Sequence, residues 1–120
     1  MSLDKKDVMR VLENVYDPEY PASIVEMGMV DEDSVEVGDG EVKVQFKPTT
    51  PFCPMGGLIG VLIRYALEKA LNVKAEVRVK PGTHLNEAMV NTMINDEAQY
   101  KRVLGQLSDM GMLERCVKVK

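Results

Sequence analysis

The sequence predicts an α+β fold in which helices pack on one face of a small sheet. Three segments alternate apolar and polar residues as half-buried strands do, and the segments between and around them have apolar residues at helical spacing. The predicted order is helix, strand, strand, helix, strand and helix, with a last strand over residues 113–119 also compatible with the pattern. A tight turn makes the first two strands antiparallel, and the whole sheet could be mixed.

Residues 4–15 are expected to form the first helix. Its apolar residues recur at intervals of three or four: Val8, Val11, Leu12, Val15. Ser2 or Asp4 can cap its start, because a short polar side chain accepts hydrogen bonds from the first free N–H groups. Pro18 biases the residue before it away from the helical region, so the helix should end ahead of it.

A hairpin is predicted next, with strands over residues 29–37 and 41–47. Gly38-Asp39-Gly40 lies between them and supplies the positive φ angles that a tight turn needs. In the second strand, valine and phenylalanine alternate with lysine and glutamine, which is typical of a strand with one buried face. The loop over residues 48–57 is rich in Pro, Gly and Thr, so it can hold a defined shape without regular pairing.

The remaining elements follow in the same way. Residues 57–71 are apolar around most of a helix, which predicts a deeply buried helix. Residues 73–80 alternate as a third strand, and residues 85–93 and 96–110 are expected to be helical. No repeat, low-complexity tract or linker interrupts the chain, so residues 1–120 are expected to form a single domain.

Composition narrows the class of protein. The 120 residues are 45% hydrophobic and 28% charged, as in an ordinary globular protein. The formal net charge of −4 argues against a nucleic-acid partner, because binding phosphates requires a basic surface. The sequence shows neither a signal peptide nor an apolar run long enough to span a membrane, so we expect a cytoplasmic protein without membrane association. Its two cysteines do not suggest a disulfide framework.

Cys53 is the residue that we expect to carry the chemistry. It lies just before the apolar helix, where unpaired N–H groups stabilise an anion and lower the pKa of a thiol. Pro51 and Pro54 restrict the backbone on either side, and Thr49 and Thr50 can donate hydrogen bonds to a thiolate or sulfide. The alternative is a buried, inert cysteine, since cysteine is among the most buried residue types.

A closed metal site within one chain is not expected, because zinc and iron–sulfur sites usually need three or four Cys or His ligands. The chain has only Cys53, Cys116 and His84, so a cluster would borrow ligands from a second subunit, a small thiol or a client protein. His84 alone is more typical of a structural or solvated histidine, and Cys116 of a packed side chain. Asp17 and Glu19 flank a proline and are either acid/base groups or hard metal ligands, or they simply end the helix.

Three motifs in order resemble one family. They are Tyr16-Asp17-Pro18-Glu19-Tyr20-Pro21, Ile24-Val25-Glu26-Met27-Gly28-Met29-Val30 and Thr50-Pro51-Phe52-Cys53-Pro54. Together they resemble the iron–sulfur (metal–sulfur) cluster assembly domain of the PaaD/SufT type, over about residues 7–80. Residues 84–120 do not match the short tail common in that family, so we treat them as a divergent helical extension.

The resemblance implies a cytoplasmic factor that helps to mature iron–sulfur proteins, often as a homodimer or within a targeting complex. Its partners would be other iron–sulfur assembly proteins and client apoproteins, and it would hold a cluster only transiently. The family's functional cysteine corresponds to Cys53, its aspartate to Asp17 and its threonine to Thr50, with Glu19 following. With Thr49 added from its chemistry, these residues form the expected site, and Cys53 is the expected metal ligand.

Three functions are therefore compared. The leading one is a non-enzymatic iron–sulfur assembly, carrier or targeting factor that works through Cys53. The second is a thiol enzyme in which Cys53 is the nucleophile and Asp17 or His84 its acid/base partner. The third is a protein-interaction module that does not need the cysteine and uses a surface rich in methionine, of which the chain has nine.

Overall fold

The computed structural model describes residues 4–17, 22–48, 56–83 and 85–118. Its elements confirm the predicted α+β class and the predicted order up to the last helices. In chain order they are α1 (Lys5–Leu12), the 3-10 turn η1 (Glu32–Ser34), β1 (Val35–Gly38), β2 (Glu41–Phe46), α2 (Gly56–Leu71), β3 (Lys74–Val79), α3 (Glu87–Asn95), α4 (Glu97–Asp109) and α5 (Met112–Cys116).

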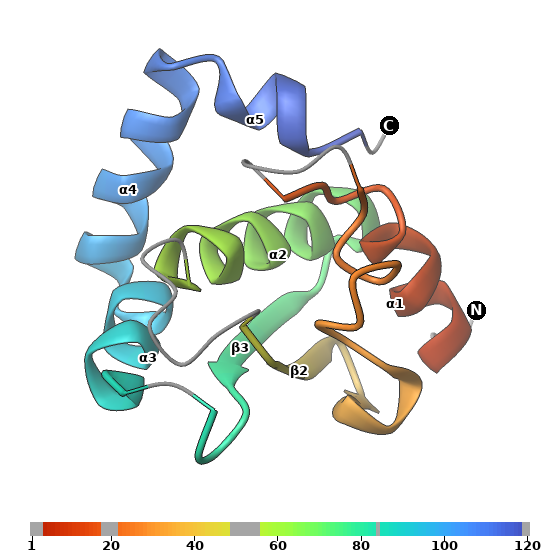
Figure 1. The fold of residues 1–120 in the computed structure, drawn as a ribbon. Helices are drawn as coiled ribbons and strands as arrows, with labels where there is room; N and C mark the ends of the chain where they lie inside the picture. The colour runs from red at the N-terminus through yellow and green to blue at the C-terminus, as the bar shows by residue number, and fades with distance from the viewer. Residues whose placement is uncertain (1–3, 18–21, 49–55, 84, 119–120) are drawn as a thin grey trace.

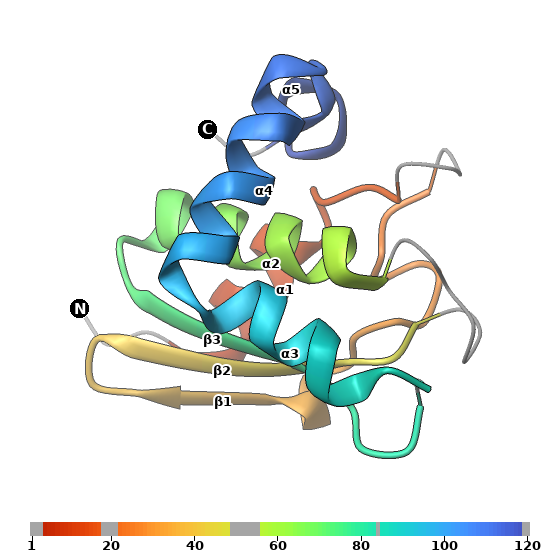
Figure 2. The same ribbon diagram turned by 90° about the vertical axis from the view of Figure 1, so that its left-hand side faces the viewer.

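The described strands form a mixed sheet in the order β1-β2-β3. β1 pairs antiparallel with β2, and β2 pairs parallel with β3. Val44 lies between Val35 and Val77 in this register, and all three side chains are buried on one face. Lys43, one residue earlier on β2, is exposed on the opposite face. Figure 2 shows α1 and α2 on the same side of the sheet, which is the side that the valines need to be covered.

α1 starts where the sequence places a cap. The Asp4 carboxylate accepts a hydrogen bond from the Asp7 N–H at 3.0 Å, and the Asp7 carboxylate accepts one from the Asp4 N–H at 3.1 Å. This reciprocal capping box satisfies two backbone donors and fixes the first turn. The helix then buries Val8 and Leu12 completely, and these side chains pack it against the core.

α2 is the central helix, and two glycines on it allow α3 to approach closely. A Cβ atom at Gly57 would lie 2.5 Å from Met93 Sδ, and one at Gly60 would lie 2.7 Å from Ile94 Cγ1. A larger residue at either position would force its neighbour to shift, which the flexible Met93 side chain can do more easily than Ile94. Because Ile94 is fully buried, the contact fixes α3 beside the first turns of α2.

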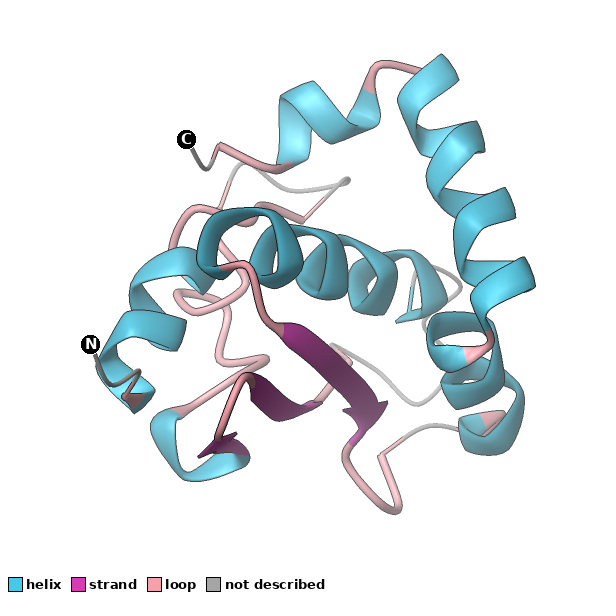
Figure 3. Ribbon diagram, turned by 180° about the vertical axis from the view of Figure 1, so that it is seen from behind, coloured by secondary structure: helices cyan, strands magenta, loops and turns pink. Residues whose placement is uncertain are grey.

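The chain after β3 runs along the sheet edge as α3, rises as α4 and returns above α2 as α5 (Figures 1 and 3). Gly111, with φ of 73°, takes the left-handed conformation that reverses the chain between α4 and α5. The strand expected over residues 113–119 is therefore wrong for most of its length, because α5 occupies residues 112–116. Among its described residues, 113–118, only Val117 forms a bridge, which is antiparallel and pairs it with Val15.

The first predicted strand is also too long. Within residues 29–37 only Val35 onward is strand, and the 3-10 turn η1 precedes it. The Asp31 carboxylate accepts hydrogen bonds from Ser34 N at 3.0 Å and Ser34 Oγ at 2.9 Å. This local side-chain bonding offers the backbone a turn in place of a strand.

Candidate functional site

The predicted site centres on the connection between β2 and α2. Cys53, Thr49 and Thr50 lie outside the described residues, as do Glu19 and His84, so their side chains are placed by sequence position alone. The described chain fixes both ends of the connection: β2 ends at Phe46, and α2 begins at Gly56. Cys53 therefore precedes the first residue of α2 by three positions, close to the helix start that the sequence predicts.

The residues that flank this connection are held firmly. Phe46 is fully buried, and its carbonyl oxygen accepts a hydrogen bond from Lys80 N at 2.8 Å. Lys47 N donates to Met29 O at 2.7 Å, so the chain that follows β2 is tied to the segment before η1. On the other side, Gly57 packs against Met93 of α3. Both anchors of the predicted cysteine loop are thus part of the core.

Asp17 is the one supporting residue of the predicted site that the structure describes. Its side chain is only 7% exposed, which is unusual for a carboxylate. Its backbone N–H donates to Ala22 O at 3.2 Å, and the preceding N–H of Tyr16 donates to Cys116 O at 2.7 Å. The local backbone is therefore fixed from two directions, and the role of Asp17 in the site stays a prediction.

The segments that lead into and out of the two undescribed stretches, residues 18–21 and 49–55, reach the same end of the molecule. In Figure 2 all of them point to the right, where α2 begins and β2 ends. The described residues next to Asp17 and those that flank residues 49–55 therefore lie at one end of the molecule.

Metal ligands are sparse in the described part of the chain. No group of three or more His, Cys, Asp or Glu side chains comes together there in a way that could hold a metal ion. Cys116 is 2% exposed and packs in the core, in the manner expected of a structural cysteine.

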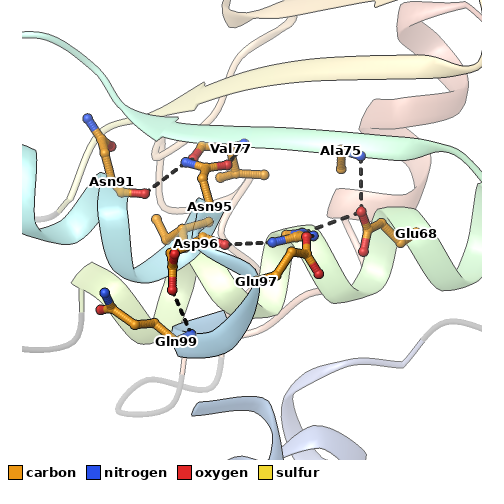
Figure 4. Close-up of polar contacts among 10 residues, drawn as sticks. Glu68, Ala75, Val77, Asn91, Asn95, Asp96, Glu97 and Gln99 are labelled. Atoms are coloured by element: carbon orange, nitrogen blue, oxygen red, sulfur yellow. Dashed lines mark hydrogen bonds and ion pairs between the residues drawn. The ribbon is translucent and has the colours of Figure 1, made fainter. Parts of the chain in front are cut away.

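Arg64, on the middle of α2, makes contacts that the sequence analysis did not anticipate. Its guanidinium group is buried and donates from Nη1 to Ile94 O at 2.9 Å, from Nε to Glu68 at 3.3 Å and from Nη2 to Glu97. Its Cζ also lies 3.8 Å from the centre of the Tyr100 ring. Figure 4 shows two of these partners, Glu68 and Glu97, beside α2. One charged side chain therefore fixes α3 and α4 to α2.

The charges of this cluster alter its pKa values. Burial acts to lower the pKa of Arg64, but its hydrogen bond and proximity to Glu97 and Glu68 outweigh burial, so the pKa is raised. The hydrogen bond from Arg64 lowers the pKa of Glu97. Burial raises the pKa of Tyr100, which keeps its hydroxyl neutral. At neutral pH the cluster thus combines the Arg64 cation, the Glu97 carboxylate and the neutral Tyr100 ring.

The outer edge of β3 is covered by side chains in place of a fourth strand. The N–H groups of Ala75, Val77 and Val79 donate to Glu68 at 3.2 Å, Asn95 at 3.4 Å and Asn91 at 2.7 Å, in that order. Asn95 Nδ2 returns a hydrogen bond to Val77 O at 2.8 Å (Figure 4). α2 and α3 therefore satisfy this edge, and β3 is held where the chain turns toward α3.

The sequence did contain signals for this cluster. Arg64 is a single cation in an otherwise apolar stretch, and Glu68 follows it at the spacing that brings side chains together on a helix. A lone buried arginine requires partners, since an unpaired buried charge is costly. The sequence did not indicate Glu97 or the Ile94 carbonyl as those partners, because both come from an element that lies far along the chain.

A family model described as "Iron-sulfur cluster assembly protein" matches residues 5–80, well over half of the chain. The chain belongs to the iron–sulfur cluster assembly protein family. The match includes all three motifs noted in the sequence and everything from α1 to β3. It confirms the expected role in iron–sulfur cluster assembly at the level of the family.

Curated relatives extend the likeness beyond the family model. "MIP18 family protein galla-2" of Drosophila melanogaster is 32% identical over 98% of this chain and 78% of its own length. "Cytosolic iron-sulfur assembly component 2B" of Mus musculus is 30% identical over 99% of the chain and 76% of its own length. "Protein AE7" of Arabidopsis thaliana is 32% identical over 96% of the chain and 76% of its own length. The likeness to these members therefore continues past residue 80 into the C-terminal helices.

Membrane insertion was not expected from the sequence. Among the helices of the described residues, none combines the length and the apolar character needed to cross a bilayer. α2 is the most apolar of them, and it is covered by α1, α3 and the sheet. In this member of the iron–sulfur cluster assembly family, the apolar helix forms part of the hydrophobic core.

Proposed function

We propose that this protein is a cytoplasmic iron–sulfur assembly, carrier or targeting factor that helps to mature client proteins through Cys53. The cluster is its cargo, held transiently by the Cys53 thiolate together with ligands from elsewhere. Asp17, Glu19, Thr49 and Thr50 support the cysteine by charge and hydrogen bonding. The resemblance to the PaaD/SufT type within the family is part of this proposal.

One observation carries the proposal: the family match spans the cysteine loop and the helix that this loop precedes. The backbone N–H groups at the start of a helix favour a negative charge, so a thiol close to that point is more readily deprotonated. A deprotonated thiol is the form that binds iron. The buried anchors on both sides of residues 49–55 restrict where that sulfur can lie.

The partners follow from the shortage of ligands. One thiolate cannot complete the coordination of an iron–sulfur cluster, which usually has four cysteine ligands. A second copy of the chain, another assembly protein or the client apoprotein would supply the rest. The name of the mouse relative, a cytosolic iron–sulfur assembly component, supports a cytoplasmic location and work alongside other assembly proteins.

The two cysteines provide a matched test. The parent, Cys53→Ala and Cys116→Ala are reconstituted anaerobically with iron and sulfide, and bound iron and sulfide are measured. In parallel, each variant is expressed in cells that lack the protein, and the activity of an iron–sulfur enzyme is followed. We expect Cys53→Ala to lose both properties and Cys116→Ala to keep both in the fraction that folds. The proposal fails if Cys53→Ala matures clients as well as the parent.

A second function has one observation in its favour. Leu85 and Met89 at the start of α3 are 66% and 61% exposed, more than large apolar side chains usually are. They favour an interaction module that works without the cysteine. Pull-downs with the parent and with Cys53→Ser decide between the two functions: identical partners together with intact client maturation support the module.

A further inference from the structure

The two edges of the sheet differ. At the β3 edge, three successive N–H groups are bonded to side chains of α2 and α3, so no further strand can add there. At the β1 edge, Val35 N donates to Glu32 O in the preceding turn η1, and no other described residue pairs with the outer side of the strand: β1 hydrogen-bonds to β2 on one side only. Alternate residues of β1 turn their N–H and C=O groups away from β2, as in any edge strand. The β1 edge is therefore open to pairing.

The open edge also has an apolar position that is not fully covered. Val35 is completely buried, but Val37, on the same face and nearer the end of β1, is only partly buried against the core. Figure 2 shows β1 at the rim of the sheet, with the turn η1 at the start of the strand. An added strand would pair with the backbone of β1 and cover Val37.

The charge around β1 is uniform. The segment over residues 31–41 contains six acidic residues and no basic one, and all six side chains are exposed: Asp31, Glu32, Asp33, Glu36, Asp39, Glu41. None of these carboxylates forms an ion pair with another described residue. Cations near them are Lys43, opposite Glu36 on β2, Lys74, opposite Glu41 on β3, and Lys80, which acts on Asp31 at a distance. The edge therefore presents a net negative surface to an incoming chain.

We propose that the β1 edge is a docking site for an extended, lysine- or arginine-rich segment of another protein, which adds as a fourth strand. Backbone pairing gives such a contact its geometry, and the acidic residues on both sides of β1 select a basic partner. A second copy of this chain is disfavoured as the occupant, because edge-to-edge pairing would bring two sets of carboxylates together. The proposal uses no residue of the cysteine loop, so it stands or falls independently of the cluster-carrier proposal.

The test uses the full chain and a short synthetic peptide in which Lys alternates with Val. Binding is measured by calorimetry at low salt, and the contact is mapped through backbone amide shifts of the isotope-labelled protein. Two control peptides accompany it: one with Glu in place of each Lys, and one with alternate amides N-methylated so that one edge cannot donate hydrogen bonds. The Lys–Val peptide is expected to bind and to shift the β1 amides, and both controls are expected to bind at least tenfold more weakly.

A matched pair of variants separates local charge from total charge. The double variant Asp33→Asn with Glu36→Gln removes two charges beside the edge, and Asp109→Asn with Glu114→Gln removes two exposed charges from the C-terminal helices. We expect the first to weaken binding about fivefold, from two surface charge contacts, and the second to leave it unchanged. Equal weakening by both variants, shifts that map away from residues 35–38, or undiminished binding of the N-methylated peptide would each overturn the proposal.

Discussion

Arg64 joins three helices through one guanidinium group. It is on α2, it donates to the last turn of α3, and it binds Glu97 at the start of α4. The arginine side chain is 7% exposed, whereas those of Glu68 and Glu97 are 28% and 63% exposed. Only the cation is deeply buried, so its loss would not leave a buried carboxylate behind. The free energy of unfolding lost on removing Arg64 should come mainly from leaving the Ile94 carbonyl without its donor and from losing the contact with Tyr100.

Replacing Arg64 with methionine is therefore expected to lower the free energy of unfolding by about 2–3 kcal/mol, because charged hydrogen bonds are lost and a buried carbonyl loses its donor. Arg78→Met is the matched control. Arg78 also pairs with a glutamate, at 2.9 Å, but its side chain is 52% exposed, so the change should be below about 0.5 kcal/mol. Urea unfolding measures both. Equal effects would contradict a special role for Arg64.

The ion pair between Arg64 and Glu97 also predicts that the stability of the fold depends on pH. Because Arg64 lowers the pKa of Glu97 in the folded state, this pair stabilises the fold above the pKa of an unfolded glutamate. The stabilisation is lost as the pH falls through the lower, folded value. A carboxyl titration by NMR should place the Glu97 midpoint below that of exposed glutamates, and Arg64→Met should move it back up. A Glu97 midpoint that is unchanged by this substitution would show that Arg64 does not cause the shift.

At the level of single residues, the sequence predicted the features that depend on residues close together in the chain. The start of α1 at Asp4 was visible because the capping residues lie three apart in the chain. The partners of Arg64 were not visible, since Ile94 and Glu97 come from about thirty residues later and are brought close only by the packing of α3 on α2. The position of Cys53 relative to α2 could be predicted, whereas the direction of its sulfur stays a prediction.

Among the elements, the contact between α2 and α3 depends on small residues. A Cβ atom at Gly60 would lie 3.1 Å from Phe46 Cε1 and closer still to Ile94. We expect Gly60→Ala to cost about 1–3 kcal/mol in spite of alanine's better helix propensity, because the packed neighbours must move. Gly105→Ala on α4 is the control: nothing lies within 4 Å of its Cβ position, so a gain of about 0.5–1 kcal/mol is expected. Thermal or urea unfolding that gives both variants the same sign would refute this.

The edge of β3 gives a second prediction at this scale. Asn95→Ala removes the acceptor of the Val77 N–H, and Asn91→Ala removes that of the Val79 N–H. Each is expected to cost about 1–2 kcal/mol. Amide hydrogen exchange should show faster exchange at Val77 in the first variant and at Val79 in the second. Each variant is the control for the other, and a loss of protection that does not follow this pattern would mean that the side chains do not cap the edge.

The errors in the predicted elements have local causes. The segment before β1 contains buried Met29 and Val30, so its apolar residues suggest a strand, but the Asp31 side chain bonds to Ser34 and forms a turn. Residues 113–119 contain Val117 and Val119, which favour a strand, yet the left-handed Gly111 starts a short helix first. In both places a side-chain or glycine effect overrode hydrophobic periodicity, whereas longer segments such as α2 and β2 followed it.

At the scale of the whole molecule, the region beyond the family match completes the fold. α3 supplies the side chains that cap β3, and the chain end returns to the start of the protein. Tyr16 N donates to Cys116 O at 2.7 Å, and Lys118 N donates to Asn14 O at 2.9 Å. These bonds hold the backbone immediately before Asp17. The C-terminal helices therefore support one part of the proposed site as well as the core.

Removing residues 112–120 tests whether the C-terminal segment stabilises the core and the backbone before Asp17. Met112, Cys116 and Val117 are each at least nine-tenths buried, and their loss would expose Val15, so we expect the free energy of unfolding to fall by about 4 kcal/mol. The urea midpoint measures this, and amide exchange should quicken at Tyr16. Met110→Ala, just before the removed segment and 70% exposed, should change stability by less than about 0.5 kcal/mol. A truncated chain with the parent's midpoint and a protected Tyr16 amide would mean that the terminal pairing contributes nothing, and that Asp17 is held by α1 and the segment after it.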